Sequence, residues 1–224
     1  MRHTLFITGT GTGAGKTLLT RLLAVFLRRR GVKVAAFKPL CSGGRADARA
    51  LHAALGGELT LDEINPWHFR AAITPSLAAR REKKSVSLAG VLAHIRARQE
   101  PFEMTLVEGA GGLLSPLGVN FDSRDLMVAL RARPVIVAPN RLGVINHVRL
   151  TWEALPTNVR KRAKVVLMFP AEPDAASATN ARLLSLWIPQ GNLFTLPWVG
   201  EEFDPASVIR TGRIAQTLRA LTRV

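Results

Sequence analysis

Apolar runs and amphipathic segments alternate along the whole chain. Short runs that are almost entirely apolar predict strands at residues 5–8, 32–37, 104–107, 135–138, 165–169 and, more weakly, 193–196. Between these runs, helix-like periodicity predicts helices at residues 17–30, 46–55, 88–99, 123–131, 146–155, 177–187 and 208–223. Strands that are apolar throughout are typical of a mostly parallel sheet with helices on both faces. We therefore predict an α/β fold built on such a central sheet.

The domain organisation follows from the absence of any dividing segment. The chain has 224 residues and contains no internal repeat, no low-complexity tract and no linker rich in glycine or serine. A chain of this length is ordinary for one compact α/β unit, so we predict a single domain over residues 1–224. Ligands of parallel sheets bind at the carboxyl ends of the strands, which directs attention to the segments that follow them.

The segment after the first predicted strand reads GTGTGAGKT and leads into a helix. A strand, a glycine-rich loop, Lys-Thr and a helix form the P-loop arrangement, in which backbone N–H groups and the helix N-terminus bind phosphates. We expect Lys16 to reach the β- and γ-phosphates and the Thr17 hydroxyl to bind Mg²⁺. Five residues separate Gly9 from Gly15, one more than in the usual motif, so a glycine-rich turn without a ligand is the alternative. The pattern favours a P-loop NTPase-like domain.

Polar residues also follow the second predicted strand. Lys38 stands at its end in the segment KPLCSGG, and Ser42 lies just beyond. If the Lys38 ammonium points into the same cleft as Lys16, it would stabilise the charge that builds up during phosphoryl transfer. The simpler interpretation of Lys38 is a solvated lysine at a strand end. Asp47 begins the next helical segment, where a carboxylate either favours the helix dipole or binds a metal.

The third predicted strand ends in Glu108, which is followed by a glycine-rich run at Gly109–Gly112. Carboxylate and hydroxyl oxygens are the ligands that Mg²⁺ prefers, so Thr17, Asp47 and Glu108 form a candidate magnesium site. The glycines allow a ligand close to the backbone. Farther along, a glycine turn and a predicted helix at Gly143–Asn146 would present free N–H groups to a carboxylate.

Taken together, these segments resemble the dethiobiotin synthetase family. The matching segments are FITGTGTGAGKT, KPLCSG, DARAL, NPWHF, VEGAGGLLSPL and RLGVINH, which span residues 5 to about 150. The resemblance implies an ATP-dependent ligase of biotin biosynthesis that makes a cyclic urea from 7,8-diaminopelargonate, CO₂ and ATP. In that family a carbamate attacks the γ-phosphate, and the second amine then closes the ring and releases phosphate.

The resemblance also implies residue roles. Lys16 and Lys38 would stabilise the transferred phosphoryl group, and Thr12 and Ser42 would hold carbamate and phosphate oxygens. Contacts to ATP would come from Gly13, Ala14, Gly15, Lys16, Thr17, Leu18, Glu108, Gly109, Ala110, Gly111, Pro197 and Trp198. Contacts to the diamine would come from Ser42, Gly112 and Leu113. Further contacts would come from the second subunit of a homodimer, through its Gly143, Val144, Ile145 and Asn146. The active site would then lie at the subunit interface.

Two positions depart from the family pattern. Gly11 stands where the family typically carries Asp, and Phe169 or a neighbour stands where an Asn often reads adenine. The choice among ATP, CTP and GTP therefore stays open, although Leu196–Gly200 matches a segment that usually runs beside the base.

Composition narrows the remaining alternatives. The net charge is +15, but the basic residues are scattered and are not interleaved with aromatic residues, which favours a compositional bias over nucleic-acid binding. The other candidates are a MinD/ParA-type ATPase, which usually carries a second lysine in its phosphate loop; a cobyrinate-amidating enzyme, which usually carries a glutaminase domain; and a non-catalytic nucleic-acid-binding P-loop protein. A single cysteine, Cys41, and the lack of a long apolar run or signal peptide predict a cytoplasmic protein without a membrane segment.

Overall fold

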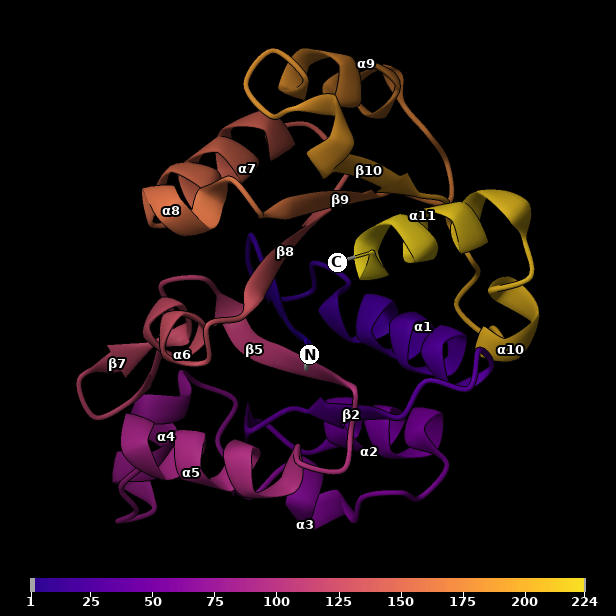
Figure 1. Ribbon diagram of the computed structural model, residues 1–224. Helices are drawn as coiled ribbons and strands as arrows, with labels where there is room; N and C mark the ends of the chain where they lie inside the picture. Colours follow the sequence, from indigo (N-terminus) through magenta and orange to yellow (C-terminus); the bar gives the residue numbers. More distant parts are fainter. Residues whose placement is uncertain (1–2, 224) are drawn as a thin grey trace.

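A six-stranded parallel sheet forms the centre of the computed structural model, which describes residues 3–223 (Figure 1). The strands lie in the order β10-β9-β8-β1-β5-β2, and every neighbouring pair is parallel. Their bounds are β1 (His3–Gly9), β2 (Val34–Phe37), β5 (Met104–Gly112), β8 (Arg133–Pro139), β9 (Lys164–Met168) and β10 (Leu193–Leu196). All six predicted strands are present, and the predicted α/β class is confirmed.

Helices cover both faces of this sheet (Figure 1). One face carries α1 (Lys16–Arg28), α2 (Ala46–Leu55), α10 (Pro205–Val208) and α11 (Gly212–Thr222). The other face carries α5 (Leu88–Arg98), α6 (Ser123–Ala129), α7 (Val144–Glu153) and α8 (Thr157–Arg160). Helix α9 (Ala175–Leu184) lies beside α7 and the edge strand β10. Within residues 3–223, none of the helices combines the length and the apolar character needed to span a membrane.

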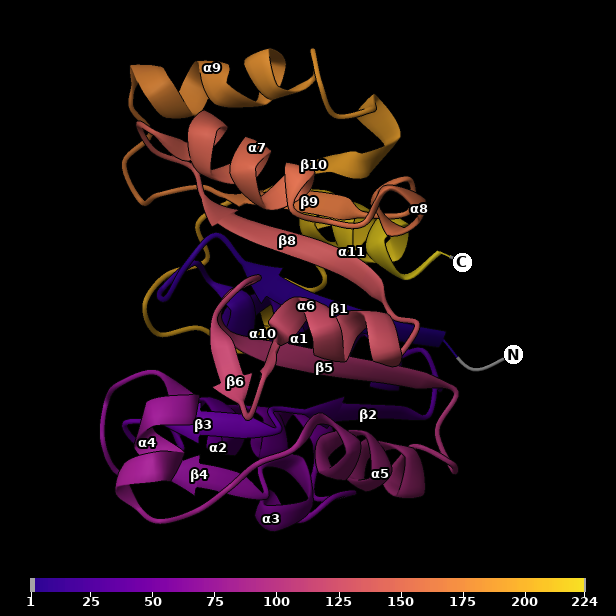
Figure 2. The ribbon, with the colours of Figure 1, turned by 90° about the vertical axis from the view of Figure 1, so that its left-hand side faces the viewer.

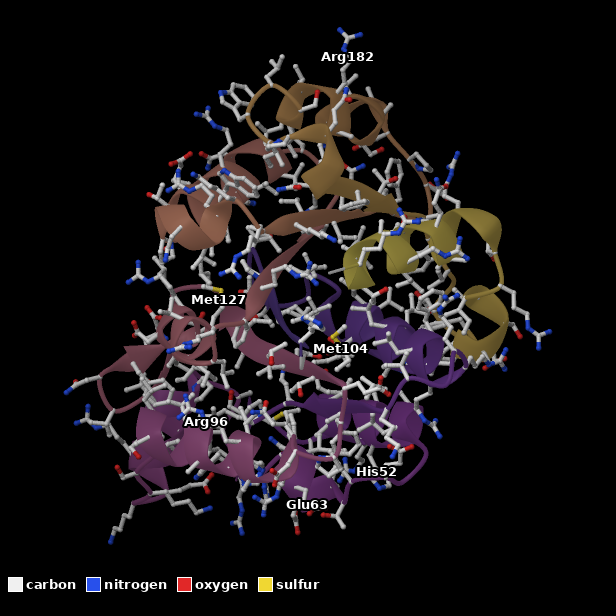
Figure 3. The ribbon with its side chains drawn as sticks, viewed as in Figure 1. His52, Glu63, Arg96, Met104, Met127 and Arg182 are labelled. Atoms are coloured by element: carbon white, nitrogen blue, oxygen red, sulfur yellow. The ribbon has the colours of Figure 1, made fainter. Side chains whose placement is uncertain are left out.

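The central strands are apolar because both of their faces are covered. Leu5, Phe6 and Ile7 of β1 are consecutive and fully buried, so side chains that point to opposite sides of the sheet both enter the core. Figure 3 shows Met127 of α6 pointing inward, whereas Arg182 of α9 extends away from the molecule. The core on both faces holds the strand ends in fixed positions, which is the condition for a site built from loops.

Several short elements were not predicted. Two of them, β3 (Leu40–Ser42) and β4 (Trp67–Phe69), pair in parallel beside the carboxyl end of β2, and β6 (Pro116–Gly118) and β7 (Phe121–Asp122) form a small antiparallel pair. The others are α3 (Leu61–Ile64), α4 (Pro75–Arg81), α8 and a 3₁₀ turn at Gln190–Asn192. They are too short for a periodic pattern to reveal.

Two predicted boundaries were wrong for identifiable reasons. Strand β5 continues beyond Glu108 to Gly112, because after a register shift Gly112 pairs with Gly9 of β1. The helix predicted at residues 208–223 begins only at Gly212, as α11. Val208 instead ends α10, where Asp204 accepts hydrogen bonds from the N–H groups of Ala206 and Ser207, and the extended Thr211 separates α10 from α11.

Candidate active site

Loops from the carboxyl ends of the central strands gather on one side of the molecule, toward the left in Figure 2. They enclose a cleft of about 650 Å³. Its walls come from the loop after β1, the end of β2, β3, the start of α2 and the glycine-rich end of β5, with one further wall from the segment before α4. The predicted convergence of these strand ends is therefore present.

The loop after β1 has the conformation of a phosphate-binding loop. Gly13 and Gly15 have φ angles of 73° and 93°, in the left-handed region that favours glycine, and α1 begins immediately at Lys16. The Lys16 ammonium donates a hydrogen bond of 2.8 Å to the carbonyl of Gly11. Burial, and secondly the charge of Lys38, lower the pKa of Lys16 to about 8. A polyanion in the cleft would offset the cost of burying this ammonium, since an adjacent negative charge favours the charged form of lysine.

Lys38 lies at the centre of the site and is 3% exposed. Its ammonium contacts Glu108 Oε1 at 2.7 Å, the Gly109 carbonyl at 3.0 Å and Asp47 Oδ2 at 3.2 Å. Burial disfavours the charged lysine, but Glu108 and then Asp47 outweigh burial and raise the pKa of Lys38. Burial likewise acts to raise the pKa of Asp47, but Lys38 lowers it. Lys38 is therefore a fixed positive charge, and the interpretation of a solvated lysine is wrong.

The oxygen atoms predicted for magnesium surround Lys38. The Thr17 hydroxyl donates a 2.8 Å hydrogen bond to Glu108 Oε1, and Glu108 is 1% exposed. The other carboxylate oxygen, Glu108 Oε2, is buried without a hydrogen-bond partner. A buried oxygen without a donor fits a cation ligand. Among residues 3–223, no three or more His, Cys, Asp or Glu residues form a group that could hold a metal ion by themselves.

A second cleft of about 500 Å³ joins the first. Thr12, Gly111 and Ser115 line both clefts and so form the junction between them. The rest of the second cleft is largely apolar, and its lining includes Leu113, Leu114, Pro116, Leu150 and Ala154. Sequence reasoning missed Ser115 and the contribution of Leu150 from α7 to this cleft. Ser115 follows the glycine run directly, and that position was the only signal for it.

The structure brings most of the predicted residues together. The first cleft is lined by Thr12, Gly13, Ala14, Gly15, Lys16, Thr17, Leu18, Lys38, Ser42, Asp47, Ala110 and Gly111, and the second by Gly111, Gly112 and Leu113. Glu108 and Gly109 lie beneath the first cleft, where both contact Lys38. Cys41 also lines the first cleft, as a buried thiol whose pKa burial raises to about 11.

Other predicted residues line neither of these two clefts. Gly143, Val144, Ile145 and Asn146 form the start of α7, with Gly143 in the left-handed region at φ 88°. Pro197 and Trp198 follow β10, and the Trp198 side chain is about half exposed. The Met168 side chain lies against the phosphate loop, since a Cβ atom added to Gly15 would lie 3.1 Å from Met168 Cγ. The backbone N–H of Phe169 donates to the Leu196 carbonyl at 2.9 Å.

Comparisons with known proteins agree with this geometry. A family model described as an AAA domain matches residues 3–200. Among solved structures, the pNOB8 ParA structure bound to nonspecific DNA superimposes with a TM-score of 0.60 and covers 100% of this chain and 98% of that one. The sequence identity is 10%, so this likeness shows the fold alone.

Curated relatives are considerably more similar in sequence. The ATP-dependent dethiobiotin synthetase BioD of Anaeromyxobacter sp. (strain Fw109-5) is 41% identical, over 77% of this chain and 79% of its own length. The protein of the same name from Akkermansia muciniphila is 39% identical, over 80% of this chain and 84% of its own length. The protein of the same name from Methanococcus vannielii is 34% identical, over 73% of this chain and 75% of its own length. Since such relatives match most of their own length as well as most of this chain, the chain belongs to the ATP-dependent dethiobiotin synthetase family.

Proposed function

We propose that this protein is a magnesium- and ATP-dependent dethiobiotin synthetase of biotin biosynthesis, which closes the urea ring of 7,8-diaminopelargonate with CO₂. The observation that carries the proposal is the arrangement around Lys38. A buried ammonium group, two carboxylates and the Lys16–Thr17 pair meet at the phosphate loop, and an apolar cleft opens beside them. This arrangement suits a reaction in which a triphosphate and a small amphipathic molecule must meet.

Each cleft suits one substrate. The first cleft has the backbone N–H groups and the lysines that a triphosphate requires. The second has leucine and proline walls that suit the methylene chain of the diamine. The reacting groups would then meet at the junction, near Thr12 and Gly111. Bringing them together in fixed orientation lowers the entropic part of the barrier.

The chemistry proceeds in three steps. One amine of the diamine adds to CO₂ and loses a proton, which gives a carbamate. A carbamate oxygen attacks the γ-phosphorus, the bond to the ADP oxygen breaks, and a carbamic–phosphoric anhydride forms. The second amine then attacks the carbonyl carbon, the C–O bond to phosphate breaks, and a further proton leaves. ATP thus converts a poor leaving oxygen of the carbamate into phosphate.

The residues of the site suit these steps. Lys16 and Lys38 would offset the negative charge on the transferred phosphoryl group, and Thr12 and Ser42 would donate hydrogen bonds to carbamate and phosphate oxygens. Thr17, Asp47 and Glu108 would hold Mg²⁺, which when bound neutralises phosphate charge. The four side-chain charges of Lys16, Lys38, Asp47 and Glu108 cancel, so the metal supplies the net positive charge.

A second subunit would complete the diamine site. Leu142 and Leu150 are 85% and 63% exposed, and Leu150 lines the second cleft. Exposed leucines of this kind favour an interface, and a homodimer would bring the Gly143–Asn146 segment of the partner subunit to the carboxylate of the substrate. We expect Leu142→Asp to weaken dimerisation in sedimentation experiments and to raise the KM for the diamine. A monomeric wild-type protein with full activity would contradict this part.

The nucleotide base and the location of the protein are also part of the proposal. Phe169 offers no side-chain amide to a base, so we expect CTP and GTP to support turnover alongside ATP. Pro197 and Trp198 are the candidates for contacts to the base. No nucleic acid or membrane is needed for the reaction, and its requirement for ATP suits the cytoplasm.

The proposal is tested by incubating the protein with diaminopelargonate, labelled bicarbonate, Mg²⁺ and each nucleoside triphosphate separately. Mass spectrometry should detect dethiobiotin that carries one labelled carbon. Lys16→Ala should abolish the product, and the exposed Lys84→Ala should not. If the protein consumes ATP equally well without the diamine and forms no product, an ATPase of the MinD/ParA type becomes the better interpretation.

A further inference from the structure

Ser115 occupies a position that none of the assigned roles explains. It follows the glycine-rich end of β5, and the residue lines both the first and the second cleft. Among residues 3–223, Thr12 and Gly111 are the only other ones in the linings of both clefts. Thr12 comes from the phosphate loop and Ser115 from the turn after β5, so the junction has one hydroxyl group on each of two separate segments.

A tight turn holds Ser115 in place. The Ser115 backbone N–H donates to the Gly112 carbonyl at 3.2 Å, and the Gly112 N–H donates to Ser115 Oγ at 2.8 Å. Gly111 has a φ of +68°, and a Cβ atom added to it would lie only 2.5 Å from Ser115 Oγ. The hydroxyl group therefore lies directly against the glycine that lines both clefts. One hydrogen bond holds the hydroxyl and the other holds the Ser115 backbone.

The hydroxyl group retains an unused donor. A serine hydroxyl carries one hydrogen and two lone pairs. One lone pair accepts the Gly112 N–H, and within residues 3–223 the Ser115 hydroxyl donates to no protein acceptor. Its hydrogen is thus available to a ligand oxygen at the junction. Because the N–H of Gly112 is already bonded to Oγ, it also polarises the hydroxyl toward donation.

We propose that Ser115 donates a hydrogen bond to the carbamate formed on the diamine and so orients the attacking oxygen toward the γ-phosphorus. This inference rests on the proposed function and adds a substrate-positioning residue to it. The carbamate is the group that passes from the diamine cleft to the phosphate cleft, and Ser115 is in contact with both. Ser42 lines only the first cleft of the two, which suits an oxygen on the phosphate side.

The experiment compares wild type, Ser115→Ala and Ser115→Thr, with Ser185→Ala as a matched control, because Ser185 is partly exposed and lines neither cleft. In Ser115→Ala we expect kcat to fall about 10- to 100-fold, the effect of one hydrogen bond to a charged group. The KM for the diamine and the Kd for ATP should change by no more than about twofold, because Ser115 acts on the carbamate after both substrates have bound. Ser115→Thr keeps the hydroxyl and should recover most of the rate.

Three results would overturn the inference. Unchanged kcat in Ser115→Ala would remove the role of the hydroxyl. A parallel loss of ATP affinity, diamine affinity and melting temperature would assign Ser115 to the support of the turn alone. Failure of Ser115→Thr to recover activity while its melting temperature is normal would exclude donation by the hydroxyl. Wild-type protein that makes no dethiobiotin would overturn the proposed function itself, and the same series of assays separates that outcome from the other three.

Discussion

Replacement of Lys38 by methionine tests the electrostatic arrangement of the site. The variant keeps the volume of the side chain but removes the ammonium from Glu108 Oε1 at 2.7 Å and from Asp47 Oδ2 at 3.2 Å. Glu108 is 1% exposed, so water cannot replace the lost partner, whereas the Asp47 side chain is about half exposed and can be solvated. The effect on stability should therefore come mainly from Glu108.

The size of the effect follows from this difference. Removing one partner of a buried ion pair destabilises a protein by about 3–5 kcal/mol, and we expect the lower end, about 3 kcal/mol, because the Thr17 hydroxyl still donates to Glu108. For a domain of this size each kcal/mol lowers the melting temperature by about 2–4 °C, so a decrease of about 6–12 °C is expected. Dethiobiotin formation should be lost even at temperatures where the variant is folded.

The assay is thermal unfolding with and without Mg²⁺. The cation should recover part of the lost melting temperature in Lys38→Met and should stabilise wild type less, because in wild type Lys38 already neutralises the carboxylates. Lys84→Met is the control, since Lys84 pairs with Glu82 at 3.0 Å on the surface and should change the melting temperature much less. A Lys38→Met variant that melts like wild type and does not respond to Mg²⁺ would refute the reasoning.

Three further predictions concern the loops and the titratable groups. Gly43 has a φ of +78°, and an added Cβ would lie 2.9 Å from the Ala72 Cβ, so Gly43→Ala should lose about 1–2 kcal/mol in chemical denaturation. Burial, and secondly the charge of Arg133, lower the pKa of Lys164 from 10.5 to about 8. Between pH 8 and 10.5 the unfolded chain therefore binds more protons at Lys164 than the folded chain does, and the free energy of unfolding should rise with pH. Denaturation curves of Lys164→Met should lack that rise. Burial raises the pKa of Cys41 to about 11, so its thiol should be alkylated slowly at pH 8. Because Cys41 lines the first cleft, bound ATP should slow alkylation further, as measured by mass spectrometry. Rapid alkylation would show that the cleft wall is open.

Residues at the ends of the long strands could be predicted from the sequence. Lys38 directly follows β2 and Glu108 lies in the neighbouring parallel strand β5. Because Phe37 pairs with Val107, the register places the next residue of each segment side by side, and the two side chains meet as expected. The phosphate loop was also predictable, because β1 stands out as an apolar run and α1 is long enough to show helical periodicity. Local pattern and sheet geometry were sufficient for these residues.

The second cleft could not be predicted in this way. Leu150 enters it from α7, far along the chain from Ser115, and no local pattern links a helix face to a particular turn. The pair β3 and β4 was missed because a three-residue strand forms only where a neighbouring strand supplies its hydrogen bonds. Trp198 and Gly143 line neither cleft of the described chain, and their predicted roles await a bound nucleotide and a second subunit.

Transfer of oxygen from CO₂ to phosphate tests the central claim most directly. The protein is mixed with the diamine, Mg²⁺, ATP and freshly dissolved C¹⁸O₂ in ordinary water, and the reaction is stopped before the label exchanges with water. If a carbamate oxygen attacks the γ-phosphorus at the junction of the two clefts, each phosphate released with dethiobiotin should carry one oxygen from CO₂. Phosphate that carries no label, released together with dethiobiotin, would contradict the account.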